Sequence, residues 1–137
     1  MPILSLRGHP RTIGLCDGRL STCPSSPNCV CSDDDNGSHS IEPLRLAITP
    51  ADAWSAVGQT VRDLPGARVV SNSADYLHAE CTSSLFGFVD DLELHLRPAE
   101  GIIAIRCASS LGYSDFGVNR RRVEKLRAVL QQKKIIR

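Results

Sequence analysis

Two polar residues interrupt apolar patterns in the second half of the chain. Asp90 falls on the same side of an alternating segment as Leu92 and Leu94, and Asn119 falls on the apolar stripe of a helical segment. A carboxylate on an apolar face needs hydrogen-bond donors or becomes neutral. Such a group either clamps neighbouring elements together or, at a cleft, binds a ligand or acts as a general base. Asp90 and Asn119 are therefore the first candidates for a site.

The segments that carry these two residues are expected to meet at one end of a sheet. If Arg97 pairs with Ile102 across a hairpin, Asp90 lies opposite Ser109, because antiparallel strands run in opposite directions. We expect Asp90 to accept a hydrogen bond from the segment 109–120, with Asn119 as the first candidate donor. A closed corner would indicate a structural clamp, whereas a cleft of roughly a few hundred Å³ beside it would indicate a ligand. The predicted polar corner comprises Asp90, Asp91, Ser109, Tyr113, Asp115, Asn119 and Arg120.

A second group of polar residues could bind a metal. Two imidazoles and two carboxylates on adjacent strands are a donor set that zinc accepts. Simple cross-strand pairing is the alternative, with Arg106 neutralising Glu93. No short-spaced ligand motif supports a metal here, and we expect no cofactor. The four metal candidates are His78, Glu80, Glu93 and His95.

The six cysteines allow several interpretations. A disulfide could close the short loop from Cys23 to Cys29, which would be typical of an oxidising compartment, whereas free thiols are typical of a reducing one. The cysteine spacing does not match the two-residue gaps of common zinc sites. We expect Cys81 and Cys107 to stay unbonded, because an intervening strand would hold their α-carbons roughly 9.5 Å apart.

The elements that position these residues follow from hydrophobic spacing. Alternation predicts a strand from Leu44 to Ile48 and four more strands at about 67–72, 75–84, 88–97 and 101–110. Thr49 and Pro50 mark a helix start, and Pro65-Gly66 its end. A second helix is predicted over 116–132, with Ser114 or Asp115 as its cap. Consecutive hairpins give an antiparallel sheet. The predicted fold is α+β, a two-layer sandwich with two helices on one face and the order β-α-β-β-β-β-α.

Each helix has an apolar stripe, and the sheet has two faces of different character. Trp54, Val57 and Val61 are expected to pack against the sheet, as is Phe116 in the second helix. The apolar face takes its side chains from the leucines, isoleucines and cysteines of the strands. For the strands at 75–84 and 88–97, we expect the register that keeps the apolar side chains on one face. This register places Leu77, Ala79 and Cys81 beside Leu96, Leu94 and Leu92, and it puts His78 opposite His95. The other face is polar enough to meet water.

Length and charge limit the possible functions. A chain of 137 residues is expected to form one domain, with an irregular segment 1–40 packed on an α+β domain of residues 41–137. Residues 118–137 hold eight basic side chains and one acidic side chain. A solvated helix face, with Arg121, Arg122 and Lys125 in water, explains these charges better than nucleic-acid binding. A small molecule or a protein is the expected partner, and a homodimer is possible.

No apolar run reaches the roughly 20 residues of a membrane-spanning helix. The start of the chain is too short and too weakly apolar for a signal peptide. A cytoplasmic location is expected if the chain is complete, and an exported or organellar location if a leader has been removed.

Four short motifs together resemble the family called domain of unknown function 1499. They are Cys23-Pro-Ser-Ser-Pro-Asn-Cys29-Val30, Asp75-Tyr-Leu-His-Ala-Glu80, Gly87-Phe-Val-Asp-Asp91 and Gly112-Tyr-Ser-Asp-Phe-Gly-Val-Asn-Arg-Arg-Arg122. The resemblance runs from about Gly14 to Leu130. It implies one compact domain and marks the corner residues other than Ser109 as signature positions, but it implies no reaction, since the family has no agreed activity. This chain has Cys107 and Ser110 where the family usually has serine and arginine.

Three functions are compatible with these observations. The leading hypothesis is a non-enzymatic binding or accessory protein that uses the open sheet face or the Asp90–Asn119 corner. One alternative is a small hydrolase or isomerase with Asp90 or Asp115 as general base. The other is a protein–protein module that dimerises through its exposed sheet face.

Overall fold

A computed structural model describes residues 12–82, 88–110 and 116–137. Its main sheet has six antiparallel strands: β3 (Cys29–Cys31), β4 (Leu44–Arg45), β5 (Ala67–Asn72), β6 (Tyr76–Thr82), β7 (Val89–Arg97) and β8 (Ile102–Ser109). The strand order is β3-β8-β7-β6-β5, and β4 also pairs with β8. The fold is α+β, and the strands and helices of residues 44–132 follow the predicted order.

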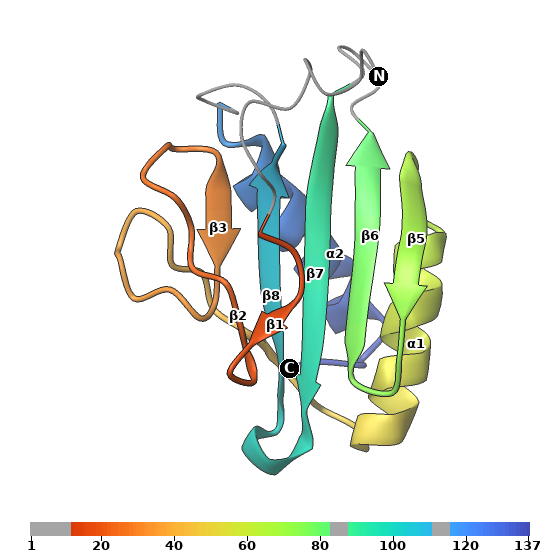
Figure 1. Cartoon of the computed structure of the whole chain (residues 1–137). Coiled ribbons are helices and arrows are strands. Elements are labelled where there is room, and N and C mark those ends of the chain that lie inside the picture. The colour runs from red at the N-terminus through yellow and green to blue at the C-terminus, as the bar shows by residue number, and fades with distance from the viewer. Residues whose placement is uncertain (1–11, 83–87, 111–115) are drawn as a thin grey trace.

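The sheet is covered differently on its two faces. Helices α1 (Pro50–Arg62) and α2 (Val118–Gln132) lie on one face, and the short hairpin of β1 (Leu15–Cys16) and β2 (Arg19–Leu20) lies across the other (Figure 1). No helix in the described part of the chain is long and apolar enough to cross a membrane. The main core lies on the sheet face that the helices cover. There, leucines of β7 and isoleucines of β8 pack with the apolar side chains of α2.

Local sequence signals explain the limits of α1. The Thr49 hydroxyl accepts a hydrogen bond from the Asp52 amide at 3.4 Å, and Pro50 occupies the first turn, where its missing N–H costs nothing. Gly66 follows the helix with a φ of +78°. A β-carbon at Gly66 would lie 2.7 Å from the Thr82 carbonyl oxygen, so only glycine fits between α1 and β6.

The β7–β8 register is confirmed, but the predicted β6–β7 register is wrong by two residues. Asp90 lies opposite Ser109 as expected. Leu77, however, lies opposite Leu94, and His78 lies opposite Glu93 instead of His95. A period-two pattern determines which face each residue occupies, but a shift of two residues leaves every face unchanged. The apolar pattern therefore could not distinguish these two registers.

The predicted helix stripes are confirmed except at Phe116. Val57 and Val61 are fully buried, whereas Trp54 is only half-buried and donates from Nε1 to the Ser73 carbonyl at 3.0 Å. Phe116 is 85% exposed, because α2 begins at Val118 and not at residue 116. The predicted capping residues Ser114 and Asp115 lie outside the described residues.

The N-terminal segment is more ordered than its composition predicted. Residues 1–40 were expected to be irregular, but β3 joins the sheet at the edge of β8, and the β1–β2 hairpin packs against β7 and β8. The polar sheet face was expected to meet water. This expectation is wrong, because Glu93 and Arg106 are buried beneath the segment. The covered face is therefore not available for the dimer contact considered above.

Candidate functional site

Arg122 of α2 joins the two residues that led the sequence prediction. Its Nη1 donates to Asp90 Oδ2 at 2.7 Å and to Asn119 Oδ1 at 2.8 Å. Asp90 and Asn119 are both buried. Arg122 lies two residues beyond the segment in which a donor was expected, and it is not the solvated charge that was predicted. Its position three residues after Asn119 was the available signal, because residues i and i+3 share a helix face.

Asn119 ties two further parts of the chain to this corner, strand β8 and the residue before β3. Its Nδ2 donates to the Asn28 carbonyl at 3.1 Å and to Ser109 Oγ at 2.9 Å. The thiol of Cys107 donates to Asn119 Oδ1 at 2.9 Å. Burial raises the pKa of Cys107, so this thiol keeps its proton. Cys81 and Cys107 are both buried and unbonded.

Two other predicted corner residues, Asp91 and Arg120, are directed away from Asp90. Asp91 points to the opposite face of the sheet, as strand alternation requires, and pairs with His78. Arg120 turns away and donates to the carbonyls of Ser38 and Ser40, both at 3.2 Å. Tyr113 and Asp115 lie outside the described residues.

A cavity of about 270 Å³ lies beside this corner. Arg122 lines it together with two other cations, and none of the described lining residues is acidic. Within the described chain, all hydrogen bonds of Arg122 run through Nη1, which leaves Nε and Nη2 without a partner. The residues of this corner cavity are Leu64, Pro65, Cys81, Val118, Arg121, Arg122 and Lys125.

The charge of Arg122 is secured by its neighbours. Burial favours the neutral guanidine, but contacts with Cys107 and Asp90 raise the pKa of Arg122 above its ordinary value. Asp90 balances one of the three positive charges at the cavity. The described lining residues of the corner cavity therefore keep a net positive charge, which suits an anionic ligand.

The opposite face of the sheet carries a buried layer of charged residues. Glu93 is fully buried and accepts hydrogen bonds from the Tyr76 hydroxyl at 2.6 Å, the Gly14 amide at 2.9 Å and Arg106 Nη1 at 3.2 Å. Burial and the bond to Glu93 raise the pKa of Tyr76. Asp33, which lies outside the sheet, accepts hydrogen bonds from both terminal nitrogens of Arg97.

The four predicted metal candidates are drawn into separate pairs. His78 Nε2 lies 2.8 Å from Asp91, and Glu80 pairs with Arg68 at 2.7 Å. Glu93 accepts hydrogen bonds from Arg106 and Tyr76. His95 accepts from Arg97 at 3.0 Å and lies 3.6 Å from Asp75. Across residues 12–82, 88–110 and 116–137, no three histidine, cysteine or acidic side chains are placed to hold a metal.

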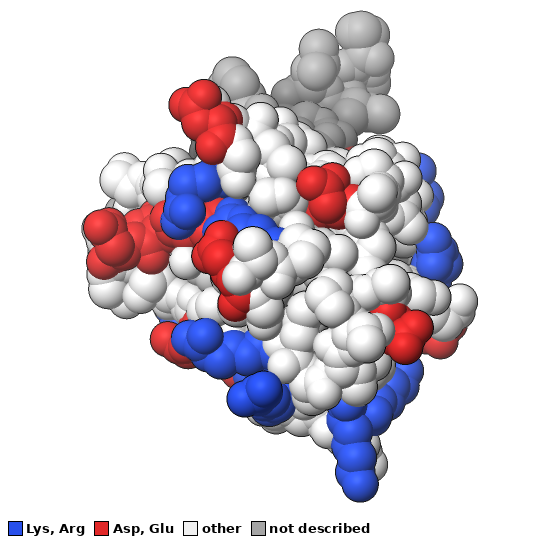
Figure 2. Space-filling view, turned by 90° about the horizontal axis from the view of Figure 1, so that it is seen from below, with Lys and Arg blue, Asp and Glu red and all other residues white. Residues whose placement is uncertain are grey.

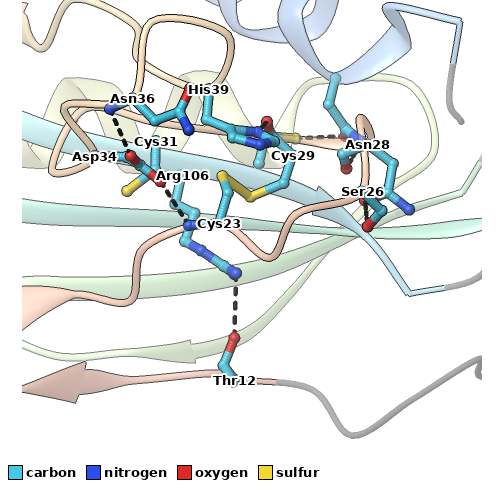
Figure 3. The surroundings of a disulfide bond; sticks show 12 residues. Thr12, Cys23, Ser26, Asn28, Cys29, Cys31, Asp34, Asn36, His39 and Arg106 are labelled. Carbon is cyan, nitrogen blue, oxygen red and sulfur yellow. Dashed lines mark hydrogen bonds between the residues drawn. A yellow bond between two sulfur atoms is a disulfide. The ribbon is translucent and has the colours of Figure 1, made fainter. Parts of the chain in front are cut away.

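A second cavity, of about 190 Å³, opens beside a disulfide that joins Cys23 and Cys29. Figure 3 shows Arg106 beside this disulfide, with its guanidinium directed to Thr12. Arg106 Nη2 donates to Thr12 Oγ1 at 3.1 Å. Cys23, Arg106 and Asp91 all line this disulfide cavity. The disulfide thus connects the N-terminal segment to strand β3 at the cavity wall.

Removal of this disulfide should measurably weaken the fold. We expect the C23S/C29S double variant to lose about 2 kcal/mol of unfolding free energy, because closing so short a loop restricts the unfolded chain only moderately. Urea denaturation measures this loss. Addition of dithiothreitol should lower the stability of the wild type by a similar amount and leave the variant unchanged. A wild type insensitive to reductant would show that the bond contributes nothing.

Comparison with known proteins assigns a family and no activity. No curated protein and no solved structure significantly matches the chain. A family model described as "protein of unknown function (DUF1499)" matches residues 19–130. This match covers most of the chain, including the disulfide and the corner residues Asp90, Asn119 and Arg122. The chain belongs to the DUF1499 family.

Proposed function

We propose that this protein is a binding domain that holds a small oxyanion with an apolar substituent in the corner cavity. The observation that carries the proposal is Arg122, a guanidinium that lines the cavity and is fixed through one nitrogen, Nη1, so that its other N–H groups remain for a ligand. An arginine held in this way can present two parallel N–H groups to a phosphate or carboxylate. Fixing Arg122 through Asp90 lowers the entropic cost of ordering it when the ligand binds.

The other walls of the cavity define the ligand further. Arg121 and Lys125 add two exposed cations, and Leu64 and Pro65 add an apolar wall. The volume of about 270 Å³ is at the small end for ligand pockets, so a single substituted ring or short chain fits. Phosphate and carboxylate share the chemistry that this site recognises.

A nucleic acid fits this arrangement less well. The three cations line one half-open cavity and do not form an extended track for a phosphate backbone. Seen from below, lysine and arginine side chains are interspersed with acidic ones (Figure 2). Any binding of nucleic acid should therefore be weak and should fade steeply with salt.

Calorimetric titration with phenyl phosphate tests the proposal, with benzoate as the carboxylate probe and phenol as the uncharged one. We expect saturable binding of at least one anion and none of phenol. The R121Q/K125Q variant should bind the anion at least tenfold more weakly, because two nearby charges in partly aqueous surroundings contribute about 1 kcal/mol each. The R45Q/K134Q variant removes the same charge away from the cavity and should bind as the wild type does.

The Asp90→Asn variant gives a readout of opposite sign. It removes the negative charge that partly neutralises Arg122, so the anion should bind more tightly than to the wild type. The proposal fails if neither anion binds, or if both double variants lose affinity equally. The second result would mean that the ligand responds only to net charge.

A further inference from the structure

A third cavity lies between the start of α2 and the loop that joins β3 to β4. Its volume is about 230 Å³, and it shares no lining residue with the corner cavity or the disulfide cavity. None of its described lining residues is acidic. The polar side chains of this loop cavity are those of Ser25, Ser38, His39 and Arg120.

The His39 ring is fixed through one of its two nitrogens. The residue is 6% exposed, and Nδ1 lies 3.0 Å from the Cys29 carbonyl oxygen. Figure 3 shows the ring turned toward Cys29. Because a carbonyl oxygen can only accept a hydrogen bond, Nδ1 carries the proton. Nε2 of the neutral imidazole is therefore an acceptor.

This second nitrogen, Nε2 of His39, has no hydrogen-bond partner in the described chain. Across the same residues, Arg106 Nε is the sole fully buried side-chain nitrogen or oxygen without a partner. His39 Nε2 is therefore not sealed, and the space open to it is the cavity that His39 lines. A buried imidazole that is fixed to a backbone carbonyl at one nitrogen presents the other nitrogen to a ligand.

Arg120 is held next to this imidazole by the residues on either side of His39. Its Nη2 donates to the carbonyls of Ser38 and Ser40, both at 3.2 Å. Its Nε and Nη1 have no partner within the described residues. An arginine anchored through one nitrogen can present its other donors to an anion.

The two groups together distinguish between anions. Arg120 attracts any anion, but the lone pair of His39 Nε2 needs a donor. A carboxylate or a sulfate carries only lone pairs at neutral pH, so it leaves this acceptor unpaired. Hydrogen phosphate has oxygens that accept from Arg120 and a hydroxyl that donates to Nε2. An ion of this size fits within about 230 Å³ and leaves space for water.

We propose that the loop cavity binds hydrogen phosphate. Its negatively charged oxygens accept from Nε and Nη1 of Arg120, and its hydroxyl donates to His39 Nε2. The Ser25 hydroxyl lines the same cavity and can supply a further donor. The proposal does not depend on the function proposed for the corner cavity, because the two cavities have no lining residue in common.

Titration with sodium phosphate and with sodium sulfate at about pH 8, followed by NMR, tests this proposal. Both ions carry about two negative charges there, but hydrogen phosphate keeps one hydroxyl. We expect phosphate to shift the His39 ring signals saturably. It should bind at least about tenfold more tightly than sulfate, because a site that pairs with a hydroxyl rejects an analogue without one. Equal affinities would overturn the acceptor role of His39, and no saturable shift at His39 would overturn the site.

Three variants separate the roles, with the amide signals of Ser25 and Ser38 as the common readout. Arg120→Gln should weaken the binding of both ions at least about tenfold. His39→Asn keeps a donor near the position of Nδ1 and removes Nε2, so the preference for phosphate over sulfate should disappear. Lys134→Gln removes an exposed charge beyond α2 and should bind both ions as the wild type does.

Two results with these variants would contradict the assignment. If Lys134→Gln loses as much affinity as Arg120→Gln, the ions respond only to net charge. If His39→Asn keeps the full preference for phosphate, Nε2 does not accept from the ligand. Should His39→Asn fail to fold, the comparison of phosphate with sulfate on the wild type still decides the role of His39.

Discussion

Replacement of Asp33 by asparagine is expected to lower the unfolding free energy by about 3–5 kcal/mol, the range for breaking one side of a buried ion pair. The Asp33 side chain is 3% exposed, and Arg97 is 8% exposed. An asparagine at this position would keep a single acceptor oxygen where Arg97 now directs two nitrogens. Asp33 also accepts from the Leu20 amide at 2.9 Å, which holds the β1–β2 hairpin over the sheet.

The same pair predicts a specific dependence of stability on pH. Burial works against ionisation, but the hydrogen bond from Arg97 and the Leu20 amide outweigh it and lower the pKa of Asp33 below its ordinary value. A carboxyl with a lowered pKa in the folded state contributes stability that is complete above its unfolded pKa of about 3.9 and is lost as the pH falls through its folded pKa. The Asp33→Asn variant should therefore show a shallower loss of stability below about pH 4.

Urea denaturation at pH 7 and in steps below about pH 4 measures both effects. The matched control is Glu42→Gln, which breaks an exposed pair whose side chains are 59% and 76% exposed. This control should change stability by less than about 1 kcal/mol. If Asp33→Asn is as stable as Glu42→Gln at pH 7, Asp33 does not hold the N-terminal segment in place.

Asp90→Ala is expected to cost about 2–3 kcal/mol, somewhat less than Asp33→Asn. Arg122 would lose its carboxylate but would keep the bond from Nη1 to Asn119 Oδ1, and it remains partly exposed at 17%. Asp90→Asn should cost about half as much, because one carbonyl oxygen remains to accept from Arg122.

Equilibrium unfolding of both variants checks this order. Wild-type stability in Asp90→Ala and Asp90→Asn would refute the clamp. Loss in Asp90→Ala with recovery in Asp90→Asn would show that the corner needs an acceptor at this position more than it needs a charge.

Most of the fold could be predicted because its signals are local. Thr49 and Pro50 mark the start of α1 within the residues that form it, and the Arg97–Ile102 pairing follows from a short turn. The β6–β7 register could not be predicted in the same way, since His78 keeps its face whether it lies opposite Glu93 or His95. A longer connection between two strands leaves shifts of two residues open.

The burial of the polar sheet face could not be predicted because its cover is distant in sequence. Gly14 reaches Glu93 across 79 residues, and Asp33 reaches Arg97 across 64. Neither the glycine nor the aspartate stands in an apolar pattern that would indicate such contacts. A stripe of alternating charged residues is typical of a solvated face, and only the partners reveal that it is buried.

The candidate site was predicted in part. Asp90 and Asn119 each broke an apolar pattern, and this contradiction placed both at one corner. Arg122 broke no pattern, because a basic residue beside a helical stripe is ordinary, and its role depends on how α2 sits against β7. The available signals were the need of Asp90 for a donor and the position of Arg122 three residues after Asn119 on one helix face.

The proposed anion site is tested most directly by amide chemical shifts during a titration with phenyl phosphate. We predict saturable changes that are largest at Val118, Arg121 and Arg122 of α2 and at Cys81 of β6. All four residues line the corner cavity. Amides of residues 99–101, in the turn at the opposite end of β7 and β8 from Asp90, should keep their positions. Shifts that never saturate, or that are largest outside these residues, would contradict the assignment of the corner cavity as the ligand site.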